Sequence, residues 1–143
     1  PLVNWIKCNT DGASTISASS CGGIFRDHSA DLIGCFAEKI PYCTAFFVEL
    51  SGVLRAIELA SQHNWHNLWL ESDSALVVIA FKNDTMIPWA LRNRWFNAKL
   101  LMRNMNVIVT HIYREGNDYA DILGYLALDS LLLRVWFGPP LIL

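Results

Sequence analysis

Near the start of the chain, residues that can pack in a core alternate with polar ones: Ile6, Cys8 and Thr10 would share one face of a strand, and Lys7, Asn9 and Asp11 the other. Successive side chains of a strand point to opposite faces, so this alternation predicts a strand. Three runs are predicted as strands, at residues 2–11, 21–26 and 31–40. The connections between them are short, which predicts an antiparallel meander.

From residue 45 the period changes to that of a helix. The apolar positions Phe46, Leu50, Val53, Leu54, Ile57 and Ala60 form one stripe and predict a helix over 45–62. Further along, the pattern predicts a strand at 67–72, helices at 74–82 and 89–104, and a strand at 107–113. A last helix is predicted at 118–130, with Asn117 as its N-cap. Three strands followed by this alternation predict an α/β (α+β) fold, in which helices flank a mixed sheet.

The length of 143 residues suits a single domain with a real core. We assign residues 1–130 to that domain and residues 131–143 to an apolar C-terminal tail. Two interpretations of the tail stay open: it covers a face of the sheet, or it is an end made sticky by truncation. The chain contains no run of eighteen uncharged apolar residues, so we expect no membrane span.

Composition and cysteine spacing indicate the class of protein and the redox state of its compartment. With 53% hydrophobic and 17% charged residues, the chain is typical of a globular protein and not of a disordered one. None of its four cysteines forms a C-x-x-C pair, which argues against a zinc site. Without a signal peptide, we expect reduced thiols in an intracellular compartment, the nucleus or cytoplasm. We also expect a monomer without a disulfide-linked partner.

Four carboxylates stand at unusual places in this pattern. Asp11 ends the first predicted strand, Asp73 directly follows the strand predicted at 67–72, Glu49 lies at the edge of an apolar helical stripe, and Asp121 lies one turn into the last helix. Singly, each has an ordinary structural explanation as a turn residue, a helix cap, a salt-bridge partner or a first-turn acid. If the four meet at one end of the sheet, their mutual repulsion indicates a site for hard divalent cations with oxygen ligands.

Four blocks of sequence carry a resemblance to a known family. They are KCNTDGAS, VELSGVLRAIELA, LWLESDS and HIYREGNDYADILG. In this order and on these elements, the chain resembles type 1 ribonuclease H, in particular the plant ribonuclease-H-like (reverse-transcriptase-like) domains derived from retroelements. The likeness runs from about residue 5 to about residue 127.

The resemblance implies a five-stranded mixed sheet flanked by helices. It also implies an endonuclease that hydrolyses the RNA strand of an RNA–DNA hybrid with two Mg²⁺ or Mn²⁺ ions. Matching the blocks residue by residue places the catalytic, metal-binding carboxylates at Asp11, Glu49, Asp73 and Asp121. Gly12 and Ala13 are then expected to be small so that a nucleic-acid backbone can come close.

A basic segment supports a nucleic-acid partner. Six basic residues and a single acid, Asp84, lie between residues 82 and 114, although the whole chain has a net charge of −2. We interpret them as a strip that follows phosphates beside the acidic site. Its interleaved aromatic residues Trp89, Trp95 and Phe96 are predicted to belong to the core. The nucleic-acid-binding residues we predict are Gly12, Ala13, Ser74, Arg92, Arg94, Lys99, Arg114 and Asn117.

Some positions depart from the family pattern. Ala45 and Ala75 stand where many members have polar groups that contact the hybrid, and the segment before the last helix has no histidine. His111 lies upstream, and we favour an ordinary strand position for it over a catalytic one. Two alternatives to the hybrid nuclease therefore stay open. One is a catalytically weak or inactive module that binds nucleic acid or protein, and the other is an integrase-like enzyme acting on DNA or structured RNA.

Overall fold

The computed structural model describes residues 3–14, 18–41, 44–113 and 134–136. The predicted helix at 118–130 lies outside these residues, as do Arg114, Asn117 and Asp121. Predictions for those positions therefore stay predictions.

The described strands form one mixed sheet. In chain order they are β1 (Ile6–Ser14), β2 (Ser19–Arg26), β3 (Leu32–Ile40), β4 (Asn67–Ser72), β5 (Asn106–His111) and β6 (Arg134–Trp136). Their order across the sheet is β5-β4-β1-β2-β3-β6. β1, β2 and β3 are antiparallel neighbours, as the short connections predict, whereas β4 pairs parallel with both β1 and β5. The predicted five-stranded mixed sheet is confirmed, and β6 is a short addition at its edge.

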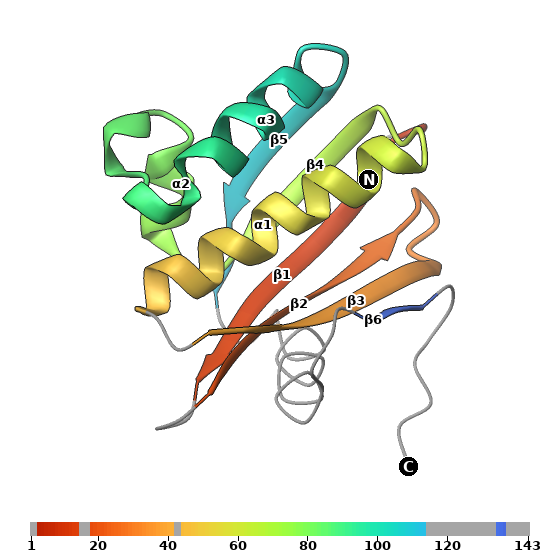
Figure 1. The fold of residues 1–143 in the computed structure, drawn as a ribbon. Helices are drawn as coiled ribbons and strands as arrows, with labels where there is room; N and C mark the ends of the chain where they lie inside the picture. The colour runs from red at the N-terminus through yellow and green to blue at the C-terminus, as the bar shows by residue number, and fades with distance from the viewer. Residues whose placement is uncertain (1–2, 15–17, 42–43, 114–133, 137–143) are drawn as a thin grey trace.

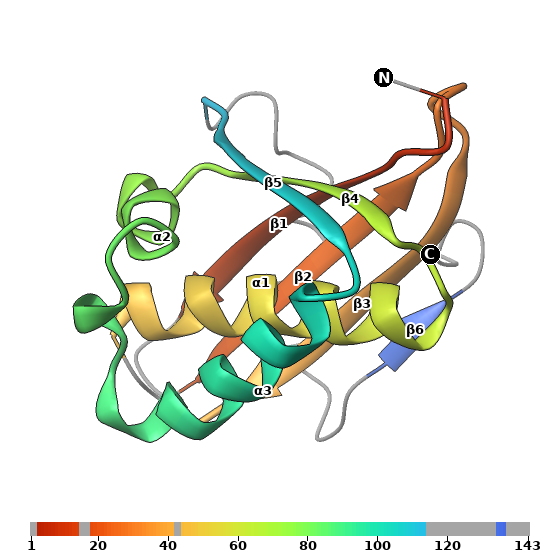
Figure 2. The same cartoon turned by 90° about the horizontal axis from the view of Figure 1, so that it is seen from above.

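Three helices lie on one face of this sheet (Figures 1 and 2). They are α1 (Ala45–Gln62), α2 (Ala75–Ala80) and α3 (Arg92–Met102). The hydroxyl of Thr44 accepts a hydrogen bond from the Phe47 amide and so begins α1. The helix predicted at 89–104 starts instead with a 3₁₀ turn, η2 (Trp89–Leu91), which follows the 3₁₀ turn η1 (Asp84–Met86).

The core lies between α1 and the sheet. The apolar stripe of α1 is fully buried at Leu50, Val53, Leu54 and Ile57. Gly52 lets the helix come close, because a Cβ atom there would lie 3.2 Å from the Cβ of Cys21. Close packing of this kind fixes the distance of α1 from the strands, and therefore the position of the side chains that α1 places beside them, Glu49 included.

Cys8, Cys21 and Cys35 are buried thiols in the described part of the chain. Burial raises the pKa of the Cys8 and Cys21 thiols, which keeps them neutral. They behave as small apolar core residues, as the sequence predicts. None of the helices among the described residues combines the length and apolar character needed to span a bilayer.

The first strand and the tail differ most from the sequence prediction. The first strand does not end at Asp11 but continues to Ser14, because its hairpin with β2 extends beyond its pairing with β4. Within the tail, Arg134–Trp136 pairs antiparallel with β3, with Cys35 opposite Trp136. Such pairing satisfies backbone groups that an edge strand leaves open. The two interpretations of the tail as a whole stay open.

Candidate metal centre

Three of the four predicted carboxylates meet at one edge of the sheet. The parallel pairing of β1 with β4 ends at Thr10 and Ser72, so Asp11 and Asp73 are the next residues of two adjacent strands. Glu49 comes from the second turn of α1. One carboxylate oxygen from each acid lies within 4.8 Å of the other two. Asp11, within β1, and Asp73, directly after β4, therefore lie close together, as a shared cation site requires.

The amide of Gly12 links two of these acids. It donates to Asp11 Oδ1 at 2.8 Å and to Glu49 Oε1 at 3.2 Å. A Cβ atom on residue 12 would lie 2.8 Å from Val48 Cγ1, so only glycine lets β1 approach α1 this closely. Helix packing thus accounts for the small size of Gly12, and the approach of a nucleic-acid backbone to this residue stays a prediction. Ala13 is buried, and its predicted contact with a nucleic acid also stays a prediction.

The carboxylate of Asp73 has no role as a helix cap. Ser74 caps α2, because its hydroxyl accepts from the Val77 amide at 3.4 Å. Asp11 Oδ2 and Asp73 Oδ2 are buried and have no hydrogen-bond partner among the described residues. Buried carboxylate oxygens without donors are costly. A divalent cation with a preference for oxygen ligands would remove that cost, so the residues present fit such an ion.

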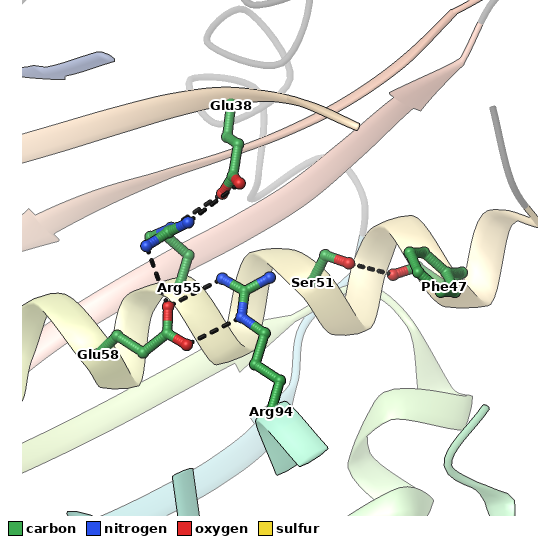
Figure 3. Close-up of polar contacts among 6 residues, drawn as sticks. All are labelled: Glu38, Phe47, Ser51, Arg55, Glu58 and Arg94. Carbon is green, nitrogen blue, oxygen red and sulfur yellow. Dashed lines mark hydrogen bonds and ion pairs between the residues drawn. The ribbon is translucent and has the colours of Figure 1, made fainter. Parts of the chain in front are cut away.

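The basic strip is organised differently from the prediction. The guanidinium of Arg94 makes two bonds of 2.8 Å to Glu58, which also contacts Arg55 (Figure 3). Lys99 Nζ lies 2.8 Å from Asp84. Arg94 and Lys99, two of the predicted phosphate contacts, thus each have an intramolecular partner that the local sequence pattern does not indicate. Arg92 forms no ion pair in the described ranges, and nucleic-acid binding by these residues stays a prediction.

The three aromatic residues of this segment do not share one environment. Trp95 is buried against the core, as expected, whereas 87% of Trp89 and 54% of Phe96 are exposed. The prediction that Trp89 and Phe96 belong to the core is wrong. The reason is geometric: α3 directs Trp95 and Ala98 inward, and Phe96 lies one residue, about 100° of helix rotation, away from Trp95.

His111 ends β5, opposite Ser72 in the register. Its side chain is exposed and contacts Tyr113 edge-on, with the ring centroids 5.8 Å apart. This position is at the same edge of the sheet as the acids, and a catalytic role for it is untested.

Comparison with known proteins places this arrangement in a family. Residues 9–127 match the reverse transcriptase-like family. The chain belongs to that family. A protein of Arabidopsis thaliana, provisionally named as a ribonuclease H protein, is 34% identical over 89% of this chain. This chain spans only 21% of that relative's length.

Solved structures show the same fold. RNase H1 of the archaeon Halobacterium salinarum superposes with a TM-score of 0.77 at 23% identity, over 88% of this chain and 98% of the archaeal one. LC11-RNase H1, isolated from compost and solved with an RNA/DNA hybrid, gives 0.75 at 20% identity, over 87% and 97% of the two chains. The N-terminal RNase H domain of a Mycobacterium tuberculosis protein gives 0.77 at 19% identity, over 89% and 95%. The chain therefore has an RNase H-like fold.

Proposed function

We propose that this domain is a metal-dependent endonuclease that hydrolyses the RNA strand of RNA–DNA hybrids. The observation that supports it most directly is the convergence of Asp11, Glu49 and Asp73, with their ligand oxygens within 4.8 Å of one another. Like charges gathered in this way destabilise a fold unless a cation is bound between them. The binding of an RNA/DNA hybrid by LC11-RNase H1, which has the same fold, supports the choice of substrate.

Each acid has a proposed role in holding the metal ions. Asp11 and Asp73 present buried oxygens without donors, and the Gly12 amide, which donates to both Asp11 and Glu49, holds Glu49 beside them. Asp121, outside the described residues, is proposed as the fourth ligand. Two Mg²⁺ or Mn²⁺ ions held by this set would supply an activated water and stabilise the charge of the leaving oxygen. The partner is thus a hybrid duplex, and the compartment is an intracellular one where such hybrids form.

The test is a cleavage assay. RNA–DNA hybrid, duplex RNA and duplex DNA, each labelled on one strand, are incubated with the protein in Mg²⁺ or Mn²⁺. We expect cutting of the RNA strand of the hybrid alone. Because the segment directly before the predicted last helix has no histidine, we expect slow turnover, so the assay runs long and at high enzyme concentration. Asp11→Asn and Asp73→Asn should each abolish cutting while binding to the hybrid, followed by fluorescence anisotropy, is largely kept.

Glu58→Gln is the matched control. Like the two Asp→Asn variants, it removes one carboxylate charge, but this charge belongs to the ion pairs of Glu58 on α1 with Arg55 and Arg94, and not to the three acids. It should cut as the wild type does. A wild type that binds hybrid without cutting in either metal would instead support the binding module, which the exposed methyl groups of Ala45 and Ala75 favour. Cutting of duplex DNA or duplex RNA would support the integrase-like alternative.

A further inference from the structure

A line of five side chains crosses three strands directly behind the acids. Glu71 of β4 is at its centre: its Oε1 lies 2.9 Å from Lys7 Nζ, and its Oε2 accepts from Asn9 Nδ2 at 3.1 Å. Lys7 Nζ also lies 4.8 Å from the centroid of the Trp69 ring, and Trp69 Nε1 donates to Thr110 Oγ1 at 2.8 Å. We call this line the polar ladder; its members are Lys7, Asn9, Trp69, Glu71 and Thr110.

The register places the polar ladder next to the metal centre. Asn9 and Glu71 are opposite each other in the parallel pair β1–β4. Asp11 and Asp73 come two residues later on the same two segments, hence on the same face. The hydrogen bond between Asn9 and Glu71 therefore joins β1 and β4 two residues before Asp11 and Asp73, the acids of the metal centre.

Glu71 itself is not available to a cation. Only 8% of its side chain is exposed, and both of its oxygens are engaged, one by an ammonium group and one by an amide. A buried carboxylate costs free energy unless it is paired and hydrogen-bonded, and here it is both. Partners that hold ligand-bearing segments in place commonly tune metal affinity as strongly as some ligands do.

We propose that the polar ladder is a positioning device for the metal centre. By fixing β1 against β4, Asn9, Glu71 and Lys7 set the spacing of Asp11 and Asp73 for divalent-cation binding. This inference rests on the proposed function, because it assumes that the acids bind a metal. The three are positioning residues: they act through Asp11 and Asp73 and do not touch the ion.

The experiment measures Mn²⁺ binding to the whole chain by titration calorimetry, without nucleic acid. Asn9→Leu removes the donor without changing charge and should raise the Mn²⁺ dissociation constant about tenfold. Glu71→Gln and Lys7→Met should raise it in the same direction, because both break the ladder. Glu58→Gln, which breaks an ion pair elsewhere on α1, should leave it unchanged. Thermal unfolding without metal is followed in parallel, to compare only variants that are folded.

Glu71→Gln and Lys7→Met remove charges of opposite sign, so their effects on Mn²⁺ affinity distinguish a positioning role from a purely electrostatic one. If Glu71 and Lys7 acted only by their charge, Glu71→Gln would weaken cation binding and Lys7→Met would strengthen it. That pair of opposite shifts would overturn the proposal. So would unchanged affinities in all three variants together with lowered melting temperatures, which would make the ladder purely structural.

Wild-type binding distinguishes the two levels of the proposal. Mn²⁺ binding that is lost in Asp11→Asn but unaffected by the ladder variants would overturn this inference alone. A wild type that binds no Mn²⁺ would overturn the proposed function and this inference with it. Should Asn9→Leu fail to fold, Asn9→Ser removes the same amide donor with a smaller polar side chain, and the same tenfold shift is expected.

Discussion

Helix α1 carries two groups of charges that are arranged in opposite ways. Near its start, Glu49 faces Asp11 and Asp73, so the group contains charges of one sign only. Six and nine residues further, about 9 and 14 Å along the helix axis, Arg55 and Glu58 belong to a chain of alternating sign. That chain runs Glu38–Arg55–Glu58–Arg94, with bonds between 2.8 and 3.1 Å (Figure 3).

The two groups differ in what they still require. In the ion-pair cluster each charge has a partner, and hydrogen bonding to Glu38 raises the pKa of Arg55. Such a cluster is complete and joins α1 to β3 and α3. In the acid group the nearest neighbours repel one another, and two buried oxygens have no donor in the part of the chain that the structure covers. A group of charges that is complete indicates a structural role, whereas one that requires a cation indicates a binding site.

Metal addition should separate the two groups most strongly. At a free Mg²⁺ concentration about 100 times the dissociation constant, wild-type protein should gain about 2.7 kcal/mol in its free energy of unfolding. Glu58→Gln should gain the same amount, because the acids are intact, whereas Asp73→Asn should gain much less. Denaturant titrations with and without Mg²⁺ measure this. Equal gains in all three proteins would place the metal elsewhere.

In the absence of metal, the same kind of substitution should have opposite effects in the two groups. Asp11→Asn relieves repulsion and keeps an oxygen for the Gly12 amide, so the free energy of unfolding should rise by about 1 kcal/mol. Glu58→Gln removes a charge from two arginine contacts and should lower it by about 1–3 kcal/mol. Chemical denaturation in the presence of a chelator gives both values. If both variants were destabilised alike, the acids would not be repelling one another.

Nucleic-acid binding should distinguish Arg92 from Arg94. Arg92→Gln should reduce the slope of log affinity against log salt by about one unit, as the loss of one phosphate contact does. Arg94 is held by Glu58, so Arg94→Gln should leave the slope unchanged while lowering stability. Anisotropy titrations of a hybrid at several salt concentrations test this. A reduced slope for Arg94→Gln alone would mean that the ion pair opens to bind phosphate.

The smallest effect belongs to the exposed pair of Asp84 and Lys99. The hydrogen bond from Lys99 lowers the pKa of Asp84, so the stability that the pair contributes is present above the unfolded-state pKa and is lost as the pH falls through the lowered value. Solvent screens the pair, so Asp84→Asn should change the melting temperature only slightly at neutral pH. The difference between wild type and variant should vanish in strong acid. A constant difference from neutral to strongly acidic pH would assign it to another cause.

Local patterns in the sequence predicted some elements to the residue. The apolar stripe gives α1 its bounds, Ala45–Gln62, and the short apolar run gives β4 its bounds, Asn67–Ser72. Both segments have a clear period and lie between turn residues, so neighbours along the chain suffice to define them. The bounds of β1 were less accurate, because its end depends on how far β2 accompanies it.

The candidate acids were also recognisable in the sequence, but for a different reason. Asp11 and Asp73 each place a carboxylate at the end of a predicted strand, where an uncharged residue would serve the strand equally well. Glu49 lies at the edge of an apolar stripe, where a charge is unexpected. Such local conflicts often mark functional positions, because binding a ligand, and not folding, explains them.

What the sequence by itself determined is thus the set of elements, the family and the candidate acids. Only the tertiary structure decided which charges have partners. Arg94 meets Glu58 from 36 positions away, and Asn9 meets Glu71 from 62. Nothing in the local pattern of either residue indicates the other, because these contacts depend on the pairing of β1 with β4 and the packing of α3 on α1. Long-range geometry therefore decides which arginine has an ion-pair partner and which acids lie together.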